Sequence, residues 1–121
     1  MVLIDSLLNE LVSSLDEATG AIIVAGDGEA VLWGVSEQPE RLRLRGAYVA
    51  VVMQTFRAAA ARAGLGALRH LVVEYDGATV IVQAIDADCF VILELKRNAT
   101  VGRAVYRMQA VAARLRDEIA A

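Results

Sequence analysis

The segment spanning residues 42–63 constrains the fold of this chain more than any other. It contains no proline, and its apolar residues recur with the period of an α-helix. One apolar stripe on the helical wheel holds Val49, Val52, Met53, Phe56, Ala60 and Ala63. An adjacent stripe holds Tyr48, Val51, Thr55, Ala58 and Ala59, which leaves only Ala50, Gln54, Arg57 and Ala61 on a narrow third side. A surface helix usually needs an apolar arc little wider than about 100°, so we expect this helix to contact a second partner beyond its own sheet.

The remaining apolar patterns predict two more helices and five short strands. Helical spacing covers residues 3–17 and 100–119. Strands are predicted at residues 21–25, 29–35, 68–75, 79–85 and 89–95. The connections at residues 26–28, 76–77 and 86–88 are too short for crossovers, so the strands they join must be antiparallel. The order αββαβββα therefore predicts an α+β sandwich, with the middle helix on one face of a five-stranded sheet and the first and last helices on the other.

Composition limits both the architecture and the compartment. With 121 residues, 57% of them apolar and 22% charged, the chain is expected to form one globular domain over residues 1–121. The single cysteine excludes a disulfide framework and fits a reducing, cytoplasmic location. No run is as long and apolar as a membrane span, and the first residues lack the basic start of a secretion signal, so no membrane partner is expected.

Few residues here are suited to catalysis. His70 is the only histidine, and the sequence suggests neither a nucleophile nor an orienting partner for it. Cys89 lies in an apolar strand, where a packing role is expected, and the two together are too few ligands for zinc. The glycine pairs at residues 26–28 and 64–66 mark turns, because neither follows a strand and opens a helix as a phosphate-binding loop does. We therefore predict no catalytic residue, no cofactor and no metal, and a protein that is not an enzyme.

Charge is unevenly distributed along the chain. The first 40 residues carry eight acidic residues and no lysine or arginine, and all twelve basic residues follow. Such asymmetry can mark a nucleic-acid surface, but the aromatic residues do not alternate with the arginines as single-strand binding requires, so no nucleic-acid partner is expected. The stretch Arg41-Leu42-Arg43-Leu44-Arg45 fits either a contact with an acidic partner or a solvated helix entry, and we favour the second interpretation.

Several motifs together resemble the Roadblock/dynein light chain family over nearly the whole chain. They are the stretch at residues 20–28 (GAIIVAGDG), Gly46 at the start of the alanine-rich helix, Gly66, and Glu74-Tyr75-Asp76-Gly77, in the family's order of elements. The resemblance implies the sheet order 2-1-5-4-3, with the third strand at an edge. It also implies dimers in which the middle helices pair and the edge strands join. The dimer interface would then consist of Tyr48, Val51, Thr55, Ala58, Ala59, Leu71, Val72 and Val73.

The same resemblance implies a function in protein interaction. Bacterial members of the family are partners or regulators of small Ras-like GTPases, and eukaryotic members are dynein light chains or scaffolds. By that likeness, the docking surface for the partner would be Arg43, Arg45, Gln54 and Arg57. The resulting hypothesis is a non-catalytic homodimer that binds a small Ras-like GTPase and modulates its nucleotide cycle or localisation. The alternatives are a dimeric scaffold without effect on GTP turnover, or a small-molecule sensor.

Overall fold

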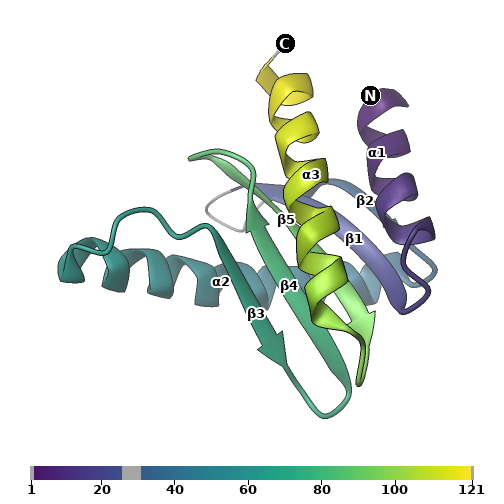
Figure 1. Cartoon of the computed structure of the whole chain (residues 1–121), viewed down its shortest axis with the longest axis horizontal. Helices are drawn as coiled ribbons and strands as arrows, with labels where there is room; N and C mark the ends of the chain where they lie inside the picture. Colours follow the sequence, from purple (N-terminus) through teal and green to yellow (C-terminus); the bar gives the residue numbers. More distant parts are fainter. Residues whose placement is uncertain (1, 26–30, 121) are drawn as a thin grey trace.

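The computed structural model describes residues 2–25 and 31–120. Within them the chain forms three helices and five strands (Figure 1). The helices are α1 (Val2–Ser13), α2 (Pro39–Ala63) and α3 (Val101–Ala120). The strands are β1 (Ala18–Ala25), β2 (Val31–Ser36), β3 (His70–Glu74), β4 (Ala78–Ala84) and β5 (Cys89–Lys96).

The strands pair side by side in the order β2-β1-β5-β4-β3, and every pair is antiparallel. The central pair is β1 with β5, in which Ile22 lies opposite Ile92. The sheet ends at β2 on one side and at β3 on the other, and each of these strands has one neighbour. Helices α1 and α3 lie together over one face of the sheet, and α2 crosses the opposite face (Figure 1).

Several predicted boundaries need correction. The second strand was expected over residues 29–35, but the described strand is β2 (Val31–Ser36), which is attached through β1 alone with a shift of register between Ile23 and Val24. The predicted turn at residues 26–28 lies outside the described residues. Helix α2 begins at Pro39 rather than at residue 42. Proline suits this position because its fixed φ is helical, and because an N–H group in the first helical turn would have no partner within the helix. The end of the helix is a left-handed cap at Gly64, with φ of 68°.

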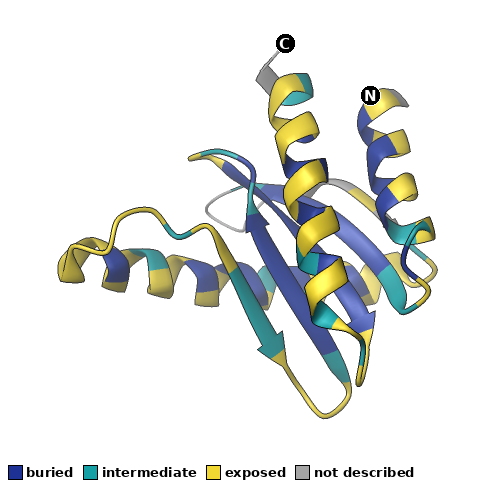
Figure 2. Ribbon diagram, viewed as in Figure 1, coloured by how far each residue is buried: buried dark blue, intermediate teal, exposed yellow. Residues whose placement is uncertain are grey.

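Two apolar cores lie on the two faces of the sheet (Figure 2). The larger core joins α1 and α3 to the sheet through side chains such as Leu8, Ile81 and Met108, which are fully buried. The smaller core lies under α2 and includes Met53 and Phe90. Helices therefore cover both faces of the sheet, and only one side of α2 packs against the sheet.

Ile22 determines how closely α2 approaches the sheet. A Cβ atom added to Gly46 on α2 would overlap the Ile22 Cδ1 atom, and one added to Gly34 on β2 would lie 2.9 Å from its Cγ2 atom. Two missing side chains thus make room for one isoleucine that is 3% exposed. A side chain at either position would force the Ile22 side chain to move, so glycine favours this close contact between helix, edge strand and central strand.

This contact also corrects the predicted orientation of α2. Ala50, expected on the narrow third side, is fully buried, whereas Val52 and Phe56, expected to face the sheet, are 38% and 48% exposed. The buried residues of α2 point in a direction that differs from that of the predicted stripe by a rotation of roughly 50° around the helix axis. Apolar residues cover so much of the circumference of this helix that hydrophobicity alone does not fix its rotation about its axis. The close fit of Gly46 against the Ile22 side chain favours the observed rotation.

Candidate functional site

The outward side of α2 carries a continuous set of exposed apolar side chains. We call this set the α2 outer face, and it consists of Leu44, Tyr48, Val51, Val52, Thr55, Phe56, Ala58 and Ala59. Tyr48 is 68% exposed and Val51 is 63% exposed. Scattered exposed apolar residues are ordinary, but a contiguous group along one helix face marks an interaction surface.

Strand β3 forms one free edge of the sheet, and a groove lies near it between α2 and the β3–β4 hairpin. Leu71, Val72 and Val73 are half-buried there, and the strand has β4 as its one neighbour in the described sheet. A groove of about 330 Å³ separates α2 from the β3–β4 hairpin, lined by side chains that include Tyr48, Val52 and Tyr75. An open strand edge beside an apolar groove is a template for pairing with another chain.

The structure divides the four predicted partner-binding residues into two pairs. Arg43 and Gln54 are exposed on α2. Arg45 instead forms an ion pair with Glu94, with 2.8 Å between the Arg45 Nη1 and Glu94 Oε2 atoms. The guanidinium carbon of Arg57 lies 5.5 Å from the centre of the Phe90 ring, a cation–π contact on the sheet side of α2. Arg45 and Arg57 thus hold α2 against the sheet.

Glu94 is a buried carboxylate that the sequence interpretation did not single out. It is 7% exposed, faces α2, and accepts a 3.0 Å hydrogen bond from the Thr19 hydroxyl in addition to the Arg45 bond. The signal in the sequence was a single charged residue inside an otherwise apolar strand. A buried charge needs such partners, so Glu94 ties α2 to β1 and β5.

Replacing Arg45 by methionine should therefore destabilise the fold. Methionine keeps most of the apolar stem but leaves the Glu94 carboxylate with Thr19 as its remaining side-chain donor. The Arg45 side chain is 42% exposed, and solvent screening reduces the loss to about 1–3 kcal/mol in urea unfolding. Changing Glu94 to leucine in the same chain should recover most of this loss, and an Arg45→Met variant as stable as the parent would contradict the argument.

The structure places neither His70 nor Cys89 in surroundings that would make its side chain reactive. His70 is exposed at the start of β3. Cys89 is 7% exposed, and burial raises the pKa of its thiol, with the nearby carboxylate of Asp86 raising it further. The neutral thiol is therefore favoured to a higher pH than in a free cysteine, which makes it a poor nucleophile.

A thiol reagent such as DTNB should accordingly react slowly with the folded protein at pH 8. We expect Cys89 to react at least about 100-fold more slowly than in the chain unfolded by guanidinium chloride, because reaction requires local opening of the fold. The rate should rise with pH as the thiolate forms. Equal rates in the folded and unfolded chains would show that the thiol is accessible.

Two other features were searched for in the described residues. No three side chains of the metal-binding types gather within them closely enough to hold an ion. None of the three helices contains a stretch long and apolar enough to cross a bilayer in the part of the chain that the structure describes.

Comparisons with known proteins show the fold. No family model matches the sequence, and no curated protein matches it either. Among solved structures, a Roadblock/LC7 domain from Streptomyces avermitilis has a TM-score of 0.87 and 23% identity, covering 97% of this chain and 98% of the other. MglB from Myxococcus xanthus has a TM-score of 0.87 and 10% identity, covering 98% and 96%.

A third structure, described as MglB with a tetrameric arrangement, has a TM-score of 0.84 and 18% identity, covering 96% of this chain and 87% of the other. These identities are low, but the structures superpose over nearly their full lengths. The family resemblance in the sequence is thus confirmed at the level of the fold, and the chain has the fold of the Roadblock/LC7 domains.

Proposed function

We propose that this protein is a non-catalytic homodimer that binds a small Ras-like GTPase and acts on its nucleotide cycle or its localisation. The α2 outer face carries the proposal, because it leaves a long apolar surface uncovered beside a free strand edge. The likeness to Roadblock/LC7 domains and MglB supports a protein-interaction role.

A second copy of the chain is the first partner that this surface suits. Pairing of two α2 helices would cover Tyr48, Val51 and Thr55, and the small side chains of Ala58 and Ala59 would allow the helices to approach closely. Pairing of two β3 strands would satisfy the backbone groups along Leu71, Val72 and Val73. The MglB structure with a tetrameric arrangement supports self-association within this fold.

The GTPase would then contact the residues of α2 that self-association leaves accessible. Arg43 and Gln54 are the exposed polar residues of the four expected there, since Arg45 and Arg57 contact Glu94 and Phe90 within the chain. An exposed arginine near the start of the paired helices can steer an acidic partner and accelerate its association. This contact involves no catalytic group from the chain.

The test uses the purified protein with a Ras-like GTPase encoded in the same genome. Calorimetry measures binding, and single-turnover GTP hydrolysis and nucleotide release measure the effect on the cycle. The double variant Arg43→Glu, Gln54→Ala should weaken binding by about tenfold or more, whereas Arg103→Glu on the exposed side of α3 should not.

The outcomes separate the candidate functions. Binding with a changed rate of hydrolysis or release supports a regulator, and binding without either change supports the scaffold alternative. If no Ras-like GTPase from that genome binds, or if Arg103→Glu weakens binding as much as the α2 variant, the proposed function is wrong.

A further inference from the structure

A groove runs between α1 and α3, the two helices that cover the face of the sheet opposite to α2 (Figure 2). Its volume is about 430 Å³. Leu11 and Val111 line it and are buried, and Tyr106 lines it and is 72% exposed. Arginine side chains of α3 also line it. The groove therefore combines apolar side chains with positive charge, and none of its residues belongs to the α2 outer face.

The arginines that line this groove lie along one side of α3. Arg103, Arg107 and Arg114 are four and seven residues apart, which at 100° per residue places them within an arc of roughly 40°. They extend about 16 Å along the helix, and all three are exposed. We call these three residues the α3 arginine row. The exposed, small Ala110 lies within the row and leaves room for a close approach.

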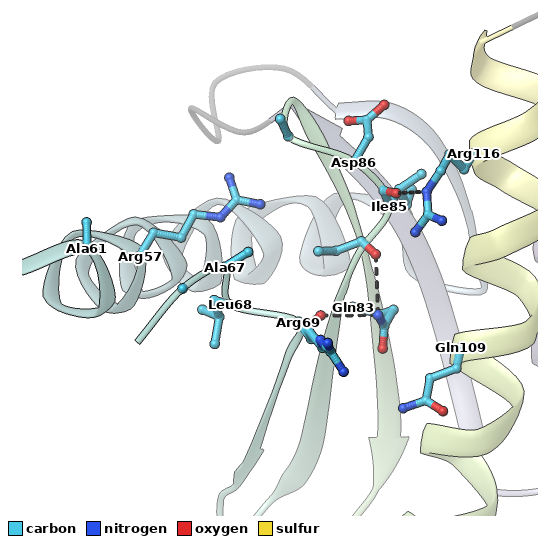
Figure 3. A pocket seen from close by; sticks show the side chains of 13 residues that line it. Arg57, Ala61, Ala67, Leu68, Arg69, Gln83, Ile85, Asp86, Gln109 and Arg116 are labelled. Carbon is cyan, nitrogen blue, oxygen red and sulfur yellow. Dashed lines mark hydrogen bonds between the residues drawn. The ribbon is translucent and has the colours of Figure 1, made fainter. Parts of the chain in front are cut away.

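The arginine row is not used up by contacts within the chain. Its first two members form no ion pair within the described residues. Arg114 pairs with Glu10 at 3.5 Å, but both side chains are more than half exposed, so this pair contributes little. Arg116, on the other side of α3, is instead bonded to the fold, because its Nε atom donates to the Ile85 carbonyl oxygen at 2.6 Å (Figure 3). Two positive charges thus remain uncompensated at the groove.

The charges of α3 stand where they reduce the stability of the helix. Arg103 lies in the first turn, which contains no acidic residue, and Arg107 follows one turn later. Positive charge near a helix N-terminus is unfavourable for the macrodipole, and like charges four residues apart repel each other. The last turn carries Asp117 and Glu118 and no basic residue, which is unfavourable in the same way. Folding gives no reason for this arrangement, whereas a negatively charged partner offsets its cost.

The shape of the site indicates which kind of negatively charged partner fits. The intervals within the row are about 6 and 10 Å, which match four and seven residues of a helix and place the carboxylates of such a helix on one side. In an extended chain they correspond to two and three residues, whose side chains point to opposite faces. An anionic bilayer is flat and would touch the row without entering the groove. A helix fits both the row and the groove.

We propose that the groove between α1 and α3 binds an acidic amphipathic helix of a partner protein. Carboxylates on one side of that helix pair with Arg103 and Arg107, and an apolar side chain beside them lies against Tyr106. The site and the α2 outer face lie on opposite faces of the sheet, so both can be occupied at once. The proposal therefore holds or fails independently of GTPase binding.

The test uses two fluorescein-labelled, alanine-based helical peptides of identical composition. In the first, glutamates at the spacing of the α3 arginine row share one side of the helix with leucines. In the second, the glutamates are moved to the side opposite the leucines. We expect fluorescence anisotropy at low salt to give a dissociation constant of about 50 μM for the first peptide, and binding at least about tenfold weaker for the second. Backbone amide signals of Leu11 and Ala110 in the ¹⁵N-labelled protein should shift with the first peptide.

Matched variants identify the groups responsible. Arg103→Glu and Arg107→Glu should each weaken binding of the first peptide by about tenfold or more. Arg103→Glu should also raise the midpoint of thermal unfolding by about 4 °C, because it places a negative charge in the first turn of α3 and removes the repulsion from Arg107. Arg62→Glu is the control, since it makes the same change of charge at an exposed arginine near the end of α2. It should leave peptide binding unchanged.

Four results would overturn the proposal. The first peptide could fail to bind at millimolar concentration, or the second could bind as tightly as the first. Arg62→Glu could weaken binding as much as Arg107→Glu, which would indicate attraction by net charge alone. Finally, vesicles containing phosphatidylserine could bind the parent more tightly than the first peptide does and lose that binding in Arg107→Glu, which would assign the row to a membrane surface.

Discussion

Replacing Thr55 or Ala59 by arginine should convert a dimer of this protein into a monomer. Both residues lie in the middle of the α2 outer face, where the proposed helix pairing would bury an unpaired guanidinium in each copy. Such burial costs several kcal/mol, so the dimer dissociation constant should rise by about 100-fold or more. Light scattering at micromolar concentration should give twice the chain mass of 12.9 kDa for the parent and the single mass for each variant.

The matched control is Ala113→Arg, which places the same side chain at an exposed position of α3 on the other face of the sheet. This variant should remain dimeric and as stable as the parent. A parent protein that is monomeric at these concentrations, or a Thr55→Arg variant that stays dimeric, would contradict the proposed helix pairing. The binding test with the GTPase is independent of this result, because it does not use these positions.

Replacing Gly46 by leucine should cause the largest loss of stability among the variants of α2. Even a Cβ atom at this position overlaps the end of the Ile22 side chain, and Ile92 Cδ1 lies 3.7 Å away. A leucine has to push α2 from the sheet, which costs about 3 kcal/mol and lowers the unfolding midpoint by roughly 10 °C for a chain of this size. Thermal unfolding followed by circular dichroism measures the loss.

Ala47→Leu is the control for this variant, because Ala47 occupies the next position of the same helix and is only half-buried. It should change stability by less than about 1 kcal/mol. Gly46→Ala should fall between the two, since alanine gains about 1 kcal/mol of helix propensity while the Ile22 side chain has to move. A Gly46→Leu variant with the stability of the parent would show that Ile22 does not determine the position of α2.

The order of the elements was readable from the sequence because short turns leave few ways to connect neighbouring strands. Asp76-Gly77 and the β4–β5 turn at residues 86–88 force β3, β4 and β5 into antiparallel pairs, whatever the rest of the chain does. The face of α2 that meets the sheet was not readable in the same way. It depends on the fit between Gly46 and Ile22, which are far apart in the sequence.

The candidate site likewise combines features that could be predicted from the sequence with features that depend on the fold. The helical wheel placed Tyr48, Val51, Thr55, Ala58 and Ala59 on the side of α2 that the structure leaves exposed. It assigned Val52 and Phe56 to the sheet side and did not include Leu44, although all three are exposed. The roles of Arg45 and Arg57 could not be predicted, because Glu94 and Phe90 lie more than thirty residues further along the chain.

Arg45 and Gly46 occupy consecutive positions, and one forms an ion pair with β5 while the other lets β1 into contact. This turn and the Arg57 contact with Phe90 together fix the direction of α2 at two places along its length. A sequence change at either place would tilt the helix. It would therefore move the α2 outer face relative to the edge of β3 without changing any residue of that face.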